Sequence, residues 1–77
     1  MRIHYIREFL ELASTLNYTE AAKRLHITQP ALSKHIDAME KMLGTQLLVR
    51  SSSGMELTGA GKAFVDDARR IVNDYDF

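Results

Sequence analysis

A chain of 77 residues, 45% of them hydrophobic and 26% charged, suits one small globular domain and excludes a disordered or low-complexity chain. The absence of cysteine excludes disulfides and thiolate metal sites, and no apolar run approaches a membrane span of roughly 18 residues, so we expect a soluble, cytoplasmic protein. Ten basic and ten acidic residues give zero net charge, so any nucleic-acid-binding surface must arise from an uneven charge distribution.

The chain begins with two predicted helices. Apolar residues recur every three or four positions over 3–16, which predicts an amphipathic helix that ends near the last of them. Thr19 can cap a second, short helix over 20–25 by accepting a backbone N–H. Ala21 and Ala22 in this second helix are small, which predicts that another helix crosses it closely.

A sharp turn and a third helix come next. Only three residues separate the second and third helices, and His26 tolerates the left-handed backbone that such a turn requires. Thr28 can cap the third helix and Pro30 fits its first turn, while Gly44 predicts an end near Leu43. Four apolar residues spaced by four, three and four positions predict the buried face: Leu32, Ile36, Met39 and Leu43.

Two extended segments follow the third helix. The runs 47–50 and 55–58 flank the polar stretch 51–54, which predicts a β-hairpin with a polar tip. A hairpin of two short strands is marginally stable alone, so it should lean on the helices. Three apolar residues are expected to make that contact: Leu48, Met55 and Leu57.

A last helix is predicted after Thr58, which can cap it. Its apolar stripe again steps by four, three and four: Phe64, Ala68, Ile71 and Tyr75. The residues alone leave open whether this stripe belongs to the core of one chain or to a seam between two chains. The pattern is unbroken at Phe77, so we expect the helix to continue beyond this sequence.

Charge is unevenly distributed along the chain. Between Lys23 and Arg50 there are five basic and two acidic residues, a local charge of +3. From Glu56 onward there are three basic and five acidic residues, a local charge of −2. The middle of the chain is therefore the part that suits a phosphate backbone.

The outward face of the third helix has residue types that suit DNA. A helix, a short turn and a second helix together hold that second helix where it can enter a major groove. Gln can pair with adenine, and Ser and Lys reach base edges or phosphates. Six polar or small residues lie opposite the apolar face, the first four at its leading end: Gln29, Pro30, Ser33, Lys34, Asp37 and Lys41. The alternative is the solvated face of an ordinary helical bundle.

The stretch from Ala21 to Lys34, AAKRLHITQPALSK, resembles the LysR-type transcriptional regulators, in which QPALS is the most recognisable run. The likeness extends along most of the chain: Phe9, Glu40, Leu43, Gly44, Leu47, Leu48, Arg50, Leu57, Thr58 and Gly61. It implies a mainly α fold, a winged helix-turn-helix with a three-helix core, a two-stranded wing and a C-terminal linker helix.

The resemblance also implies a function. A DNA-binding domain over 1–58 and a dimerisation helix that starts over 59–77 would bind double-stranded DNA as a homodimer, at an interrupted inverted repeat. A sensor domain outside this sequence would bind a small-molecule effector, and the full-length protein could assemble further, into a tetramer.

Individual roles follow from the same resemblance. Thr28 would contact phosphate, and Arg50 would serve the wing near the minor groove. Bases and backbone would be contacted by Gln29, Pro30, Ser33 and Lys34. The dimer seam would consist of Phe64, Ala68, Ile71 and Tyr75. The wing tip, SSSG over 51–54, lacks the second basic residue that relatives often carry, which argues against insertion into the minor groove.

Other functions find less support in the residues. His4, His26 and His35 lie on three separate predicted elements, without a thiolate and without Glu or His at ligand spacing, so no metal site is expected. Serines lack a base at a meaningful spacing and there is no glycine-rich phosphate loop, so neither an enzyme nor a cofactor is expected. Two alternatives stay open: a helical protein–protein interaction module, which zero net charge permits, and a winged helix of another regulator family.

Overall fold

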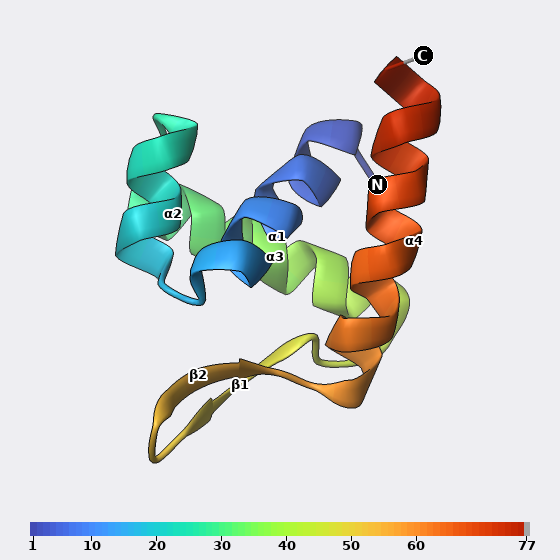
Figure 1. Cartoon of the computed structure of the whole chain (residues 1–77). Helices are drawn as coiled ribbons and strands as arrows, with labels where there is room; N and C mark the ends of the chain where they lie inside the picture. Colours follow the sequence, from blue (N-terminus) through green and yellow to red (C-terminus); the bar gives the residue numbers. More distant parts are fainter. Residues whose placement is uncertain (77) are drawn as a thin grey trace.

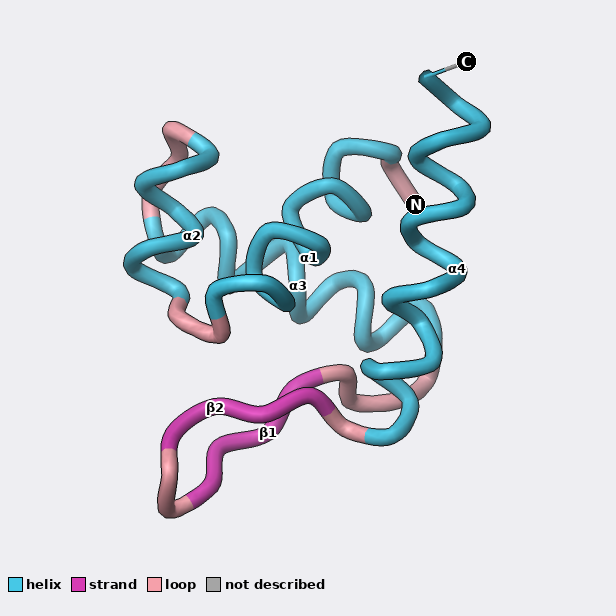
Figure 2. Tube along the Cα trace, viewed as in Figure 1, coloured by secondary structure: helices cyan, strands magenta, loops and turns pink. Residues whose placement is uncertain are grey.

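The computed structural model describes residues 1–76, which form helices and one antiparallel hairpin in the predicted order. The elements are α1 (Ile3–Thr15), α2 (Tyr18–Leu25), α3 (Gln29–Leu43), β1 (Leu48–Ser51), β2 (Gly54–Leu57) and α4 (Gly59–Asp76). Helices α1, α2 and α3 pack on one another, α4 stands against α1, and the hairpin projects from beneath them (Figures 1 and 2). This is the mainly α, winged helix-turn-helix architecture expected from the sequence. No helix among the described residues is both long and apolar enough to cross a membrane.

The hydrophobic core lies where α1 meets the other helices. Its largest fully buried side chains come from α1, α3 and the segment before β1: Phe9, Leu12, Leu32, Ile36, Met39 and Leu47. Burial of each such side chain contributes about 1.5–3 kcal/mol. Ala21 and Ala22 are also buried, and α2 contacts both α1 and α3, so the predicted close crossing is confirmed.

The start of α2 differs from the prediction. Its cap is Asn17, whose side-chain oxygen accepts the backbone N–H of Glu20 at 3.0 Å, and not Thr19. Leu16 is left-handed, with φ of 53°, so the chain reverses immediately after α1 and Asn17 takes the extended backbone of a cap. Asn is among the best N-cap residues, and α2 therefore begins two residues earlier than predicted.

The two ends of α3 follow the prediction. Thr28 accepts the N–H of Ala31 at 3.2 Å, Pro30 lies in the first turn, and Gly44 closes the helix with φ of 72°. Leu43, however, was predicted to be buried and is 40% exposed. Helix α3 extends about one turn beyond Met39, its last buried residue. The chain then turns back, and Leu47 is buried in the core where Leu43 was expected.

The hairpin is confirmed, with strands one residue nearer its tip than predicted. Leu48 pairs with Leu57 and Ser51 pairs with Gly54, so the turn consists of two residues and not four. Leu48 is buried, and Met55 and Leu57 are partly buried against the core, as expected. Thr58 caps α4 by accepting the N–H of Gly61 at 2.9 Å, also as expected.

Candidate nucleic-acid interface

The turn between α2 and α3 fixes the angle at which α3 is presented. His26 takes the predicted left-handed backbone, with φ of 58°, and its N–H bonds to carbonyls of α2. The buried Ala21 and Ala22 let α2 lie close to its neighbours. The helix-turn-helix predicted from the sequence is therefore present, with α3 as its second helix.

The leading end of α3 is exposed to solvent. Thr28, Gln29, Pro30 and Lys34 are exposed and Ser33 is partly exposed. The opposite face of α3 is held in the core by Leu32, Ile36 and Met39. Because the two faces are so different, the polar face must point away from the protein. The five residues that sequence reasoning assigned to this end are thus together on one accessible surface.

The wing is attached to α3 by Glu40, to which the sequence analysis gave no role. One carboxylate oxygen of Glu40 accepts the N–H groups of Leu47 and Leu48, at 2.7 and 3.3 Å. The sequence held only a weak signal for this role, because an acid in the last turn of a helix is slightly disfavoured by the helix dipole.

A second attachment joins the wing to α4. The Thr58 hydroxyl donates to the Gln46 carbonyl at 2.6 Å, and the Thr58 N–H donates to the Leu47 carbonyl at 2.9 Å. Gly61 packs directly on this point, because a Cβ there would lie 2.1 Å from the Leu47 oxygen. The first turn of α4 therefore locks the root of the hairpin.

The wing and the leading end of α3 border the same hollow. An open depression of about 250 Å³ is lined by residues from the start of α2, the start of α3 and the hairpin: Leu16, Asn17, Tyr18, Thr19, Gln29, Arg50 and Met55. Gln29 and Arg50, which are 21 positions apart in sequence, thus lie on one face of the molecule. The start of α2 also faces this hollow, and its unpaired N–H groups favour negative charge.

Tyr18 lies beside this hollow in an acidic environment. Burial raises the pKa of its phenol above the usual 10.0, and the carboxylates of Glu40 and Asp37 act in the same direction, whereas Arg50 opposes them. The Tyr18 side chain therefore stays a neutral hydrogen-bonding group at neutral pH.

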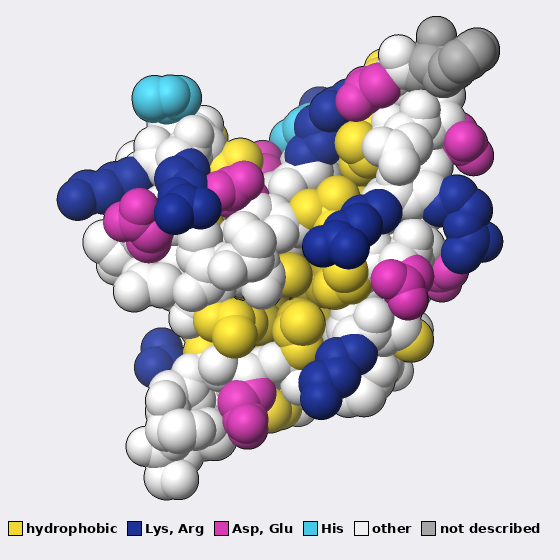
Figure 3. All heavy atoms as spheres, in the orientation of Figure 1, with side chains coloured by type: hydrophobic (Ala, Val, Ile, Leu, Met, Phe, Trp, Pro, Cys, Tyr) yellow, Lys and Arg dark blue, Asp and Glu magenta, His cyan; other side chains and the backbone are white. Residues whose placement is uncertain are grey.

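On the face of the molecule shown in Figure 3, Lys and Arg side chains alternate with Asp and Glu, and the wing tip carries no charge. Arg24, counted in the basic middle of the chain, is paired with Glu11 at 3.2 Å and with Glu20 at 3.4 Å. Lys34 and Arg50 are exposed, and no ion pair within the described residues involves either of them.

The apolar stripe of α4 divides into two parts. Phe64 packs on Phe9 with ring centroids 5.3 Å apart, and Ala68 has 0% exposure, so this half belongs to the core of the chain. Ile71 and Tyr75 are 41% and 67% exposed. Of the four residues predicted to form a seam, Ala68 has no exposed surface in this chain, and the seam itself stays a prediction.

The end of α4 is held against α1 by charge. The two terminal guanidinium nitrogens of Arg7, Nη1 and Nη2, donate to the carboxylate of Asp76, and these bonds hold the pKa of Asp76 below its usual 3.8. The Arg7 guanidinium also lies 5.9 Å from the centroid of the Tyr75 ring. These exposed contacts contribute little stability but orient the end of α4.

The histidine prediction needs a correction. Glu8 lies four positions after His4 on α1, a ligand spacing that the sequence analysis overlooked, and the fold brings His35 of α3 to both of them. His26 takes no part in this cluster, since it lies at the α2–α3 turn. The expected separation of the three histidines is therefore wrong for His4 and His35.

Comparison with known proteins gives a consistent result. The family model described as "Bacterial regulatory helix-turn-helix protein, lysR family" matches residues 3–62. The transcriptional regulator TcbR of Pseudomonas sp. strain P51 is 46% identical over 72 residues, 94% of this chain and 24% of TcbR. The Hca operon transcriptional activator HcaR of Escherichia coli K12 is 42% identical over 94% of the chain and 24% of HcaR. The chain thus spans about a quarter of the length of these relatives.

Solved structures agree with these sequence relatives. The CbnR DNA-binding domain, in complex with DNA, matches with a TM-score of 0.92 and 43% identity, over 99% of this chain and 87% of that one. The BenM DNA-binding domain, in complex with catB site 1 DNA, matches with a TM-score of 0.91 and 34% identity, over 99% and 85%.

Proposed function

Because the chain belongs to the LysR family of bacterial helix-turn-helix regulatory proteins, we propose that it directs a transcriptional regulator to specific sites in double-stranded DNA. The observation that carries this proposal is the common face of Gln29 and Arg50, which border one hollow. That face offers an exposed helix end to a major groove and a cation to the backbone beside it. Membership of this family also rules out the alternative that the chain is a winged helix of another regulator family.

The proposed contacts divide between backbone and bases. Thr28 contacts a phosphate, and Arg50 contacts the backbone from the wing. Bases and further backbone groups are contacted by side chains at the leading end of α3: Gln29, Pro30, Ser33 and Lys34. The uncharged wing tip makes no insertion into the minor groove.

Pairing of two chains is assigned to the outer half of α4. Ile71 and Tyr75 are exposed there. A separate group of hydrophobic side chains lies between α1, α4 and the hairpin (Figure 3), where Leu10, Leu57 and Val65 help to line a hollow of about 390 Å³. Burial of this apolar area between two copies would favour a homodimer. Two copies of α3 could then reach successive major grooves, about 34–36 Å apart, on an interrupted inverted repeat.

The chain is proposed as one part of a longer regulator. Residues 1–58 bind DNA and residues 59–76 begin the dimerisation helix, although Phe64 and Ala68 also complete the core. Phe77, which the sequence analysis assigned to the same helix, lies outside the described residues. A small-molecule effector would act through a further domain, as the length of the relatives allows. We assign no catalytic activity, and we place the protein in the bacterial cytoplasm, where the DNA is.

Selection from a random pool of duplexes tests this function. We expect enrichment of an interrupted inverted repeat, whose half-site and spacing the selected sequences would define. Binding of that duplex, followed by fluorescence anisotropy, should weaken with salt along a log–log slope of about −0.9 per neutralised phosphate.

The competing function is a helical protein–protein interaction module, which the zero net charge and the alternating charges on the face shown in Figure 3 favour. It predicts no enriched duplex and a binding response that changes little with salt. These two results together would contradict the DNA-binding proposal.

A further inference from the structure

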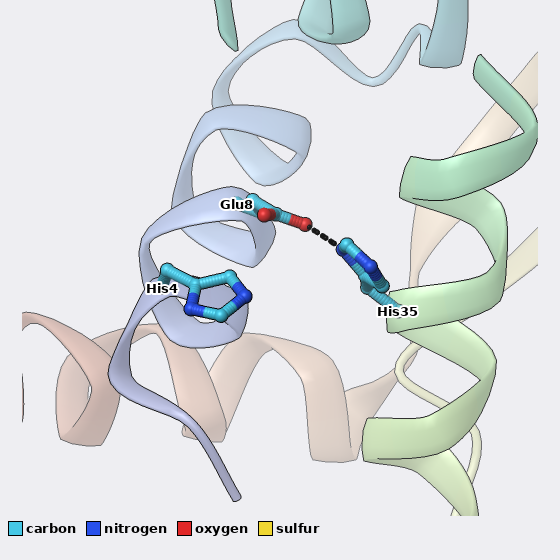
Figure 4. Close-up of side chains that lie close together, drawn as sticks. All are labelled: His4, Glu8 and His35. Atoms are coloured by element: carbon cyan, nitrogen blue, oxygen red, sulfur yellow. Dashed lines mark hydrogen bonds and ion pairs between the residues drawn. The ribbon is translucent and has the colours of Figure 1, made fainter. Parts of the chain in front are cut away.

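His4, Glu8 and His35 form a cluster that DNA recognition does not explain. One ligand atom from each lies within 4.8 Å of the others. His4 and Glu8 are one turn apart on the same face of α1, and His35 faces them from α3 (Figure 4). We propose that this cluster binds a divalent transition-metal ion of the Zn²⁺ class, which links α1 to the recognition helix.

The geometry needs only small side-chain movements. Zn²⁺ bonds of about 2.0–2.2 Å to nitrogen and oxygen place tetrahedral ligands about 3.3 Å apart. His35 Nδ1 lies 2.6 Å from a Glu8 oxygen, so these two atoms must separate by less than about 1 Å to admit the ion. His4 is exposed and can move inward without disturbing the core.

The ring of His35 is held in place before any ion binds. Tyr5 stacks on it, with ring centroids 4.2 Å apart and an interplanar angle of 15°. The edge of His4 meets the same ring at a centroid distance of 5.9 Å. A ligand whose orientation is already fixed loses little freedom when it binds a metal.

Burial of Glu8 is the strongest argument for a cation. Its carboxylate belongs to a residue that is only 6% exposed, and a buried charge is costly unless it is paired. The partner that the structure records is a single imidazole nitrogen. A divalent ion would neutralise the carboxylate and use both imidazoles, with water as the remaining ligand on the exposed side.

The donor set decides which ions fit. Two imidazoles and one carboxylate suit Zn²⁺ and similar transition metals, whereas Mg²⁺ requires oxygen ligands. The ion would bind side chains from two helices that come together only in the folded chain. Metal binding should therefore stabilise the fold.

The test is thermal unfolding and calorimetric titration of the untagged chain with ZnCl₂, with MgCl₂ as the control salt. We expect one Zn²⁺ per chain, a rise in Tm of at least about 4 °C with Zn²⁺, and no rise with Mg²⁺. His4→Gln, Glu8→Gln and His35→Gln should each weaken Zn²⁺ binding by at least about tenfold. His26→Asn is the matched control, since it removes the histidine outside the cluster, and its Zn²⁺ affinity should equal that of the wild type.

For each variant, Tm with Zn²⁺ is compared with Tm of the same variant without Zn²⁺. A variant whose Tm without metal differs from that of the wild type therefore stays informative. His4→Gln is at an exposed position and should fold normally. The proposal is overturned if the wild type shows no Zn²⁺-induced shift. It is equally overturned if the cluster variants bind Zn²⁺ as tightly as His26→Asn does. Neither result depends on DNA binding.

Discussion

A helix cap and a buried face together determine how the first turn of α3 is exposed. Thr28 caps α3, so that Gln29 and Pro30 fall in its first turn. The opposite face is buried through Leu32 and Ile36, so the first turn projects outward. A Gln amide in this place can form two hydrogen bonds with adenine, which makes Gln29 the best single candidate for base discrimination.

Replacement of Gln29 by Ala should reduce base preference. We expect a loss of about 1–3 kcal/mol at the selected site, and little change on random duplexes, because only base-specific bonds are removed. Competition anisotropy with both duplexes measures the ratio. Gln46→Ala, in the loop after α3, removes the same side-chain type as a control. An unchanged ratio in Gln29→Ala would exclude a base-reading role.

Gly61 illustrates a constraint of space. A Cβ at this position would lie 2.1 Å from the Leu47 carbonyl oxygen, which is backbone and cannot swing away. Gly61→Ala should therefore destabilise the chain by about 1–3 kcal/mol, measured by urea unfolding. Gly59→Ala is the matched control, since a Cβ there meets nothing within 4 Å. It should leave stability unchanged or increase it by up to about 1 kcal/mol. Equal stability of the two variants would contradict this account.

At the scale of elements, the hairpin depends on its neighbours. Two short strands are marginally stable by themselves. Here Glu40 of α3 holds the segment that enters β1, and Thr58 and Gly61 contact the same segment at Gln46 and Leu47. The root of the wing is therefore held to α3 and to the start of α4, and Arg50 keeps its place relative to α3.

Loss of the Glu40 side chain should loosen the wing. Glu40→Ala leaves two N–H groups without their acceptor, at an expected cost of about 1–3 kcal/mol. Amide hydrogen exchange at Leu47 and Leu48 should accelerate, while exchange in α1 follows only the global stability. Glu40→Gln keeps an acceptor oxygen, so its loss of stability should be smaller than that of Glu40→Ala. Glu56→Ala, on the exposed side of β2, serves as the control. Unchanged exchange in Glu40→Ala would show that the wing is held by other contacts.

At the scale of the whole molecule, one helix serves both the core and the proposed dimer. The inner half of α4 is buried against α1, and its outer half presents Ile71 and Tyr75. A helix fixed in this way can carry the geometry of the dimer to α3 through α1, which packs on both helices. Because the net charge is zero, long-range attraction to DNA is limited and two correctly spaced copies gain importance.

A charge in the outer half of α4 should separate the copies. Ile71→Asp places a carboxylate in the proposed seam, so we expect a shift to monomer in sedimentation velocity and weaker binding to the inverted repeat. Asn73→Asp adds the same charge to the same helix, at an exposed polar position, and should leave both properties unchanged. If Ile71→Asp sediments like the wild type, this part of α4 is not the seam.

Local rules were enough to predict the order of the elements from the sequence. The left-handed His26, the caps at Thr28 and Thr58 and the stop at Gly44 depend on residues within a few positions, and all four are present. Hydrophobic periodicity likewise placed α3 and most of its buried face. Within such short spans, backbone geometry leaves few alternatives.

Tertiary structure alone decided the contacts between distant segments. Glu40 bonds to the segment before β1, and Glu8 bonds to His35, although these residues are far apart in the sequence or lie on different elements. The burial of Ala68, which divides the apolar stripe of α4, likewise depends on how α4 packs on the rest of the chain. Periodicity shows which side of a helix is apolar, but it does not show which part of that side another helix will cover. That choice depends on how all the elements pack at once, because each buried surface must be complementary to its neighbour.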